Sequence, residues 1–317
     1  MSFDRLQEKI DRLHNPTVVG LDPALEHVPP EIMEKSISEN GETLWAAALA
    51  VYEFNMGLID ALYDIVPAVK PQLAYYEALG PEGMIALKMT CEYARWRGMY
   101  IICDGKRNDI GPTAEAYSTA YLGKIKIGSS EFYPFDADAM TVNAYPGSDG
   151  IKPFIEKAVE YDKAVFAVVK TSNKSSGELQ DLAIGTQEDG LTQEDGSPML
   201  FPLYTAVGDL MEEISIDTAG VYGYTRVGAV VGATYPEELR FLRARLKNTF
   251  FLVPGYGTQG GAATDAARAF QKDGHGAIIN SSRAVIAAWK KTGGDYAAAA
   301  RGEALKMRDE LRREIYI

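Results

Sequence analysis

Charged side chains alternate in the segment DGKRND, residues 104–109. In an extended strand Asp104 and Lys106 point to the same side, because strand side chains alternate with a period of two. Lys70 lies on the preceding predicted strand and can reach the same space. An array of lysine, aspartate and lysine keeps each charge paired while it is partly desolvated, so it can supply a proton and an electrostatic field to a reaction. The same array is also compatible with a purely structural network of ion pairs.

A glycine-rich segment, PGYGTQGG at residues 254–261, carries a second chemical signal. Its four glycines let the backbone approach a ligand closely, and it opens a predicted helix whose N-terminus favours anions. Arg283 follows the next predicted strand, and a guanidinium can hold two phosphate oxygens at once. A glycine-rich loop alone is a weak signal, but the combination predicts a phosphate-binding site.

Other polar residues stand at the ends of predicted strands, among them Asp22, Asn143 and Ser172. We take all three as candidate substrate contacts, although Asn143 and Ser172 could instead cap turns. The three histidines do not stand with other ligand residues at a recognised metal-binding spacing, so no metal site is predicted.

The elements that must position these residues follow from eight short apolar runs. Most are continuously apolar, which is typical of parallel strands buried on both faces. Because helical segments separate nearly every pair, the pattern predicts an α/β fold, a closed (β/α)8 or TIM barrel, with its active site at the carboxyl ends of the strands. The strands are predicted at residues 17–22, 68–73, 100–104, 139–143, 164–169, 228–232, 250–253 and 277–280, and the helices at 41–63, 81–97, 153–161, 236–246, 262–272 and 296–314.

The connection between the fifth and sixth strands, residues 171–226, is far longer than a typical βα loop. We interpret residues 174–226 as an insertion near the active-site face of a single domain that spans residues 1–317. The sequence TQEDG occurs in it twice, and we interpret the two copies as local turns rather than as a structural repeat.

The net charge of −12 argues against a nucleic-acid-binding surface, which needs clustered Lys and Arg. A local basic pocket can still bind a small anion, because distant charges are screened over about 8–10 Å. The sequence has no apolar run long enough for a membrane span, and its polar N-terminal stretch lacks the apolar core of a secretion signal. Two cysteines outside any CxxC pair fit reduced thiols, so we expect a cytoplasmic protein.

Taken together, these motifs resemble the orotidine 5'-monophosphate decarboxylase family. The pattern Asp104-x-Lys106-x-x-Asp109-Ile110, preceded by Lys70, looks like the active-site signature of that family. The segments VKTSN (169–173), PGYGTQGG and NSSR (280–283) match in order, so the resemblance covers essentially the whole chain. The length and the long connection are similar to those of the longer bacterial subfamily.

The resemblance implies conversion of orotidine 5'-monophosphate (OMP) to UMP and CO2 in de novo pyrimidine biosynthesis, without a metal or another cofactor. Lys106 would stabilise the carbanion at C6 of the pyrimidine and then protonate it, and Asp104 would orient Lys106. Lys70 and Asp109 would complete a charged tetrad. Asp109 would come from the second subunit of a homodimer and complete its partner's site.

The resemblance also implies the substrate contacts. Asp22 and Lys70 would contact the ribose hydroxyls, and Ser172 the pyrimidine. Thr113 would lie near the ligand across the subunit interface. The residues implied at the 5'-phosphate are Gln259, Gly260, Gly261 and Arg283.

Two other functions remain open from the sequence. Related phosphosugar decarboxylases and aldolases share the DxKxxD motif but use a magnesium ion, so loss of activity with a chelator would favour them. A catalytically silent nucleotide-binding barrel would bind UMP without turning over any substrate.

Overall fold

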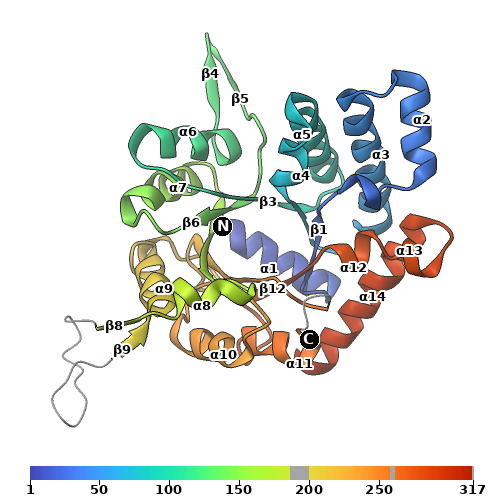
Figure 1. The fold of residues 1–317 in the computed structure, drawn as a ribbon. Coiled ribbons are helices and arrows are strands. Elements are labelled where there is room, and N and C mark those ends of the chain that lie inside the picture. Colours follow the sequence, from blue (N-terminus) through green and yellow to red (C-terminus); the bar gives the residue numbers. More distant parts are fainter. Residues whose placement is uncertain (186–199, 258–260, 316–317) are drawn as a thin grey trace.

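A closed barrel forms the centre of the molecule (Figure 1). The computed structural model describes residues 1–185, 200–257 and 261–315. Within these residues eight parallel strands close in the order β1-β12-β11-β10-β7-β6-β3-β2, which confirms the predicted TIM barrel. The barrel strands are β1 (Thr17–Leu21), β2 (Ala68–Pro71), β3 (Tyr100–Arg107), β6 (Ala139–Asn143), β7 (Ala164–Lys170), β10 (Val227–Val231), β11 (Phe251–Val253) and β12 (Ala277–Ser281).

These segments form barrel strands because their side chains are apolar on both faces. One face packs into the barrel interior and the other against the surrounding helices, so nearly every strand residue is buried. The helices lie around the outside of the strands (Figure 1). The larger ones are α3 (Leu44–Leu62), α5 (Gly80–Trp96), α6 (Gly111–Leu122), α7 (Ser148–Glu160), α9 (Leu203–Glu213), α10 (Pro236–Arg245) and α14 (Tyr296–Ile315), and the shorter or peripheral ones are α2 (Pro30–Asn40), α4 (Leu73–Glu77), α8 (Gly177–Gln180), α11 (Ala263–Ala266), α12 (Arg283–Ile286) and α13 (Trp289–Thr292).

The N-terminal helix α1 (Ser2–Leu13) closes the amino-terminal end of the barrel. Its Phe3 is fully buried and lies 4.9 Å from the ring of Phe166 and 5.1 Å from that of Phe250, centroid to centroid. Arg5 forms an ion pair with the buried Asp138 at 3.0 Å. Because this end is filled, the polar groups at the other ends of the strands are the ones that can meet a ligand.

The long connection after β7 contains both peripheral elements and one helix of the barrel itself. It contains α8 and a short antiparallel pair, β8 (Ala183–Gly185) and β9 (Leu200–Pro202), before α9. Helix α9 packs against β7 and β10, so the range predicted as an insertion, 174–226, includes one of the barrel's own helices. Both copies of TQEDG lie outside the described residues.

A second antiparallel pair, β4 (Ile125–Ile127) and β5 (Ser130–Phe132), projects from the body after α6 (Figure 1). All of its strand residues are exposed, including three large apolar ones. Within the described residues, no helix combines the length and the apolar character that a membrane span requires.

Candidate active site

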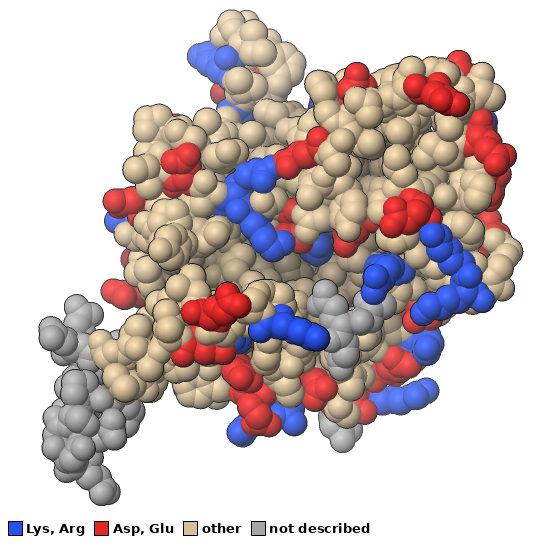
Figure 2. All heavy atoms as spheres, viewed as in Figure 1, with Lys and Arg blue, Asp and Glu red and all other residues tan. Residues whose placement is uncertain are grey.

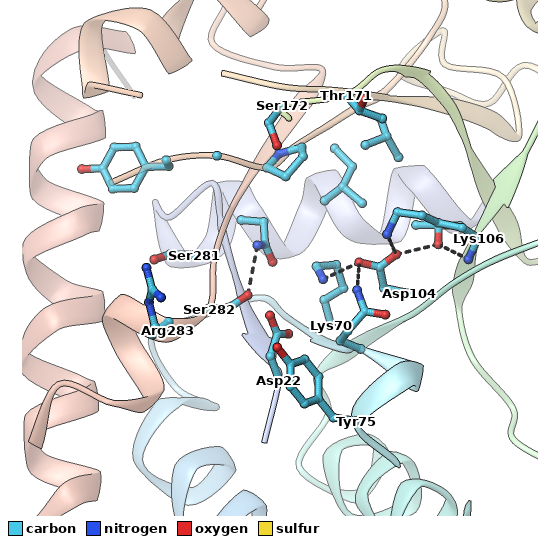
Figure 3. Close-up of a pocket in the computed structure, with 18 of the residues that line it drawn as sticks. Asp22, Lys70, Tyr75, Asp104, Lys106, Thr171, Ser172, Ser281, Ser282 and Arg283 are labelled. Carbon is cyan, nitrogen blue, oxygen red and sulfur yellow. Dashed lines mark hydrogen bonds and ion pairs between the residues drawn. The ribbon is translucent and has the colours of Figure 1, made fainter. Parts of the chain in front are cut away.

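A cavity of about 910 Å³ opens at the carboxyl ends of the barrel strands (Figure 3). Every barrel strand, or the loop that follows it, contributes to the lining. Figure 2 shows the corresponding hollow in the face of the molecule, with several Lys and Arg side chains at its rim. Six of the predicted site residues line this cavity: Asp22, Lys70, Asp104, Lys106, Ser172 and Arg283.

The carboxylate of Asp104 is the centre of the charged array. Its Oδ2 accepts hydrogen bonds from Lys70 Nζ at 2.7 Å and Gln72 Nε2 at 3.0 Å. Its Oδ1 accepts from Lys106 Nζ and from the hydroxyl of Thr141, both at 2.7 Å. Four donors use the lone pairs of both carboxylate oxygens. Asp104 is therefore built to hold the two ammonium groups in place rather than to accept a proton.

The electrostatics of the array fix its charge state. Burial alone would raise the pKa of Asp104, but the ammonium groups of Lys70 and Lys106 hold that pKa well below its usual range. Burial alone would lower the pKa of Lys70, yet the carboxylates of Asp104 and Asp22 raise it above the ordinary value. Asp104 is thus ionised and Lys70 protonated at neutral pH.

The backbone at Lys106 differs from the extended strand that was predicted for residues 104–106. The φ of Lys106 is 46°, and the register of β3 against β6 shifts between residues 103 and 107. A left-handed residue other than glycine costs roughly 1–2 kcal/mol. The amide of Lys106 donates to the hydroxyl of Thr141 at 2.9 Å, which helps to hold this bend.

Gly105 packs closely against a neighbouring side chain beside this bend. A Cβ at position 105 would lie 2.7 Å from Cδ2 of Leu73, closer than atoms in proteins approach. The side chain of Lys106 itself is 44% exposed, whereas that of Asp104 is 8% exposed. The ammonium therefore faces the open cavity while its partner lies in the wall.

Asp22, Ser282 and Arg283 lie across the cavity from Asp104 (Figure 3). Oδ1 of Asp22 and Oδ1 of Asn280 are buried acceptors without a hydrogen-bond partner among the described residues. Arg283 is the first residue of α12, and its guanidinium forms no hydrogen bond or ion pair with any described residue. This side of the cavity thus combines a guanidinium that can bind an anion with two oxygens that can accept hydrogen bonds from the hydroxyls of a ligand.

The glycine-rich loop after β11 is only partly described, because Gln259 and Gly260 lie outside the described residues. Its start needs glycine, since φ is 96° at Gly255 and 74° at Gly257. Gly261 is buried, and its amide donates to the carbonyl of Gly255 at 3.2 Å. A phosphate contact from the Gly261 amide would have to share or replace that hydrogen bond.

Besides Gly261, three predicted site residues among those that the structure describes do not line this chain's own cavity. Asp109 and Thr113 are exposed, and Oδ1 of Asp109 accepts a local hydrogen bond from the amide of Ile110 at 2.7 Å. Asn143 is also exposed, and its Oδ1 accepts from the amide of Tyr145 at 3.0 Å, which is the turn-capping geometry.

Thr141 and Gln72 were missed from the sequence, although each donates to Asp104. A signal for Thr141 exists in the segment AMTVN. Its position two residues before the strand end, in an otherwise apolar run, places a hydroxyl on the same face as Asn143. Gln72 carries no comparable signal, because β2 ends at Pro71 and the next helix begins at Leu73.

The cavity can bind an anion and give it a proton. An exposed ammonium, anchored by a buried carboxylate, can stabilise negative charge on a neighbouring atom and then protonate that atom. In the described part of the chain, no group of three or more His, Cys, Asp or Glu side chains is arranged to hold a metal ion.

Comparison with known proteins gives a consistent result over the full chain. Residues 18–294 match the family described as Orotidine 5'-phosphate decarboxylase / HUMPS. The orotidine 5'-phosphate decarboxylase of Rhodopirellula baltica is 40% identical and aligns over 97% of this chain and 98% of its own length. The enzyme of the same name from Clostridium perfringens is 36% identical and aligns over 99% of both chains.

Solved structures of proteins with the same kind of name are also similar to this chain. The structure of Leishmania donovani OMP decarboxylase has a TM-score of 0.68 and 31% identity, covering 97% of this chain and 99% of that one. The crystal structure of Plasmodium berghei orotidine 5'-monophosphate decarboxylase has a TM-score of 0.74 and 16% identity, covering 99% of both chains, and this second likeness shows the fold alone.

Proposed function

The chain belongs to the orotidine 5'-phosphate decarboxylase / HUMPS family, and we propose that it is a carboxy-lyase that converts OMP to UMP and CO2 in pyrimidine biosynthesis. The observation that carries this proposal is the Asp104 carboxylate between the ammonium groups of Lys70 and Lys106, at 2.7 Å from each. Because the proposed substrate and product are nucleotides, the cytoplasm stays the proposed compartment.

The proposed mechanism uses Lys106 as the acid. The bond between C6 and the carboxylate carbon breaks, CO2 leaves, and the electron pair stays on C6. The ammonium of Lys106 stabilises that charge and then transfers one proton to C6, which gives UMP and a neutral amine that regains a proton from water. Asp104 orients the ammonium, and no metal or other cofactor takes part in this scheme.

The proposed substrate position follows from the two sides of the cavity. Arg283 on α12 would hold the 5'-phosphate, since it is a cation without a protein partner among the described residues. Gln259 and Gly260 stay part of the proposed phosphate site. Asp22 and Lys70 would take the ribose hydroxyls, and the loop that contains Ser172 would contact the pyrimidine. Binding of the distant phosphate would help to assemble the site around C6.

We further propose a homodimer in which Asp109 and Thr113 act in the partner's cavity. Both residues are exposed and lie outside the cavity of their own chain. Ile110, directly after Asp109, is 59% exposed, and the projecting β4–β5 pair exposes Ile127 at 63%. We take these exposed apolar side chains as part of the surface that the partner subunit would cover.

The experiment that tests the proposed function is OMP turnover by the purified protein, followed by absorbance with and without EDTA. Conversion to UMP that is insensitive to the chelator would support the proposal. Turnover that is lost with EDTA would favour the magnesium-dependent phosphosugar relatives, and binding of UMP without any turnover would indicate a silent nucleotide-binding barrel.

A further inference from the structure

Lys170, the last residue of β7, is a fully buried lysine that the proposed mechanism does not use. Its Nζ forms an ion pair with Asp181, which follows α8 and whose side chain is 45% exposed. The ammonium also lies 5.4 Å from the ring centroid of Tyr204 on α9 and 4.7 Å from that of Tyr235, just before α10. A buried cation is costly unless it is paired, so this enclosure is a built feature.

The residues directly after Lys170 form the cavity loop, residues 171–173, which lines the candidate active site (Figure 3). Gln180 holds Thr171 from outside: the amide of Thr171 donates to Oε1 of Gln180 at 2.9 Å, and Nε2 of Gln180 donates to the hydroxyl of Thr171 at 2.8 Å. Gln180 and Asp181 are neighbours in sequence, so one turn both forms the ion pair with Lys170 and donates and accepts the hydrogen bonds that hold the cavity loop.

The other two positions of the cavity loop are held from the turn that follows β10. The hydroxyl of Thr234 donates to the carbonyl of Ser172 at 3.0 Å. The hydroxyl of Tyr235 donates to the carbonyl of Asn173 at 3.1 Å, and the same ring stacks over the Lys170 ammonium. Lys170 thus stands at the junction of the elements that fix the cavity loop.

We propose that the ion pair of Lys170 and Asp181, enclosed by Tyr204 and Tyr235, is a latch that fixes the cavity loop in the position that contacts the pyrimidine. Lys170 and Asp181 are then positioning residues that act through Ser172, and this inference rests on the proposed function. Without the latch the turn at 180–181 loses its anchor, and the loop must be ordered when the ligand binds. That ordering costs binding free energy.

The test uses the full chain with Lys170→Met and Asp181→Leu combined, because removing both charges leaves neither one buried and unpaired. The matched control combines Asp209→Leu with Arg245→Met, which removes a surface ion pair between α9 and α10, away from the cavity. Calorimetry measures the binding of UMP and of ribose 5-phosphate, which lacks the pyrimidine. Thermal unfolding checks that each variant is folded.

The latch predicts that UMP affinity falls by about tenfold or more in the latch variant, while ribose 5-phosphate affinity is unchanged, and that the control variant binds both ligands like wild type. Unchanged UMP affinity, or an equal loss for both ligands, would overturn the latch. If the double variant does not fold, Asp181→Asn keeps a hydrogen-bond acceptor for Lys170 and should show a smaller loss that is again confined to UMP. Wild-type protein that binds no UMP would instead overturn the proposed function, before any latch variant is compared.

Discussion

The ammonium of Lys106 lies 2.7 Å from Oδ1 of Asp104, although only one residue separates them and the backbone of Lys106 is left-handed. A regular strand would also direct both side chains to one face, but the positive φ at Lys106 interrupts the strand geometry here. The contact between the ammonium and the carboxylate is thus made from a bent backbone at Lys106. Strain of this kind persists only when the surroundings hold it, and here the hydroxyl of Thr141 accepts the hydrogen bond from the strained residue's amide.

Thr141 is the residue whose removal tests that support. Thr141→Val keeps the shape of the side chain but removes a donor to Asp104 and the acceptor for the Lys106 amide. A lost hydrogen bond to a buried charge costs about 1.5–3 kcal/mol, so we expect kcat to fall roughly ten- to a hundredfold. Steady-state kinetics measures this, and Thr141→Ser should restore most of the rate. Wild-type kcat in Thr141→Val would show that the bend does not depend on the hydroxyl.

The depressed pKa of Asp104 predicts a pH dependence of stability. A carboxyl whose pKa is lower in the folded state contributes stability above its unfolded pKa of about 3.9 and loses it as the pH falls toward the folded value. Urea unfolding of wild type and Asp104→Asn at several pH values measures the effect. The difference between the two should be constant from about pH 5 to 8 and shrink below about pH 4. A difference that grows toward low pH would contradict the assigned charge state.

The raised pKa of Lys70 predicts that its contribution to stability is lost at high pH, whereas that of Asp104 is lost at low pH. Its folded pKa is raised, so its contribution to stability is complete below the ordinary lysine value of about 10.4 and is lost as the pH rises through the folded value. Wild type compared with Lys70→Met should therefore show a constant difference near neutral pH and a shrinking one above about pH 10. Unfolding curves at alkaline pH check this. A stability difference that persists undiminished there would contradict a raised pKa of Lys70 in the folded state.

Arg283 is predicted to act through affinity for the phosphate. Arg283→Ala should weaken UMP binding by roughly 10- to 100-fold, because it removes charge-assisted hydrogen bonds worth about 1.5–3 kcal/mol. The effect on uridine, which has no phosphate, should be negligible. Calorimetry with both ligands makes the comparison, and an equal loss for uridine would place Arg283 elsewhere in the site.

Subunit mixing tests the shared site. Neither Lys106→Ala nor Asp109→Ala alone should turn over OMP well, but a mixed dimer contains one site with both native residues. Random pairing would then restore roughly a quarter of wild-type activity. The mixture is denatured, refolded and assayed beside each variant treated alone. No recovery from a mixture that contains mixed dimers would show that Asp109 serves its own chain.

The barrel could be predicted because its strands are buried on both faces, which leaves continuous apolar runs such as residues 139–143. Helix α6 (Gly111–Leu122) and the β4–β5 pair were not predicted. The helix has little amphipathic periodicity in its sequence, and each strand of the pair has three residues and no buried face.

The charged residues of the site could be predicted from type and spacing, but the way that they meet could not. The left-handed backbone at Lys106 and the hydrogen bonds that Thr141 and Gln72 donate to Asp104 depend on how separate segments pack together, and the local sequence around Asp104 does not encode that packing. The role of Lys170 was also hidden, because its partner Asp181 and its two tyrosines come from segments that only the fold brings together.

The most direct test of the proposed mechanism compares OMP turnover and UMP binding in Lys106→Ala. Removing the acid should lower kcat by roughly a thousandfold or more, while calorimetry still detects UMP binding, because the phosphate and ribose contacts remain. Near-normal turnover by Lys106→Ala would show that another group protonates C6 and would contradict the central assignment.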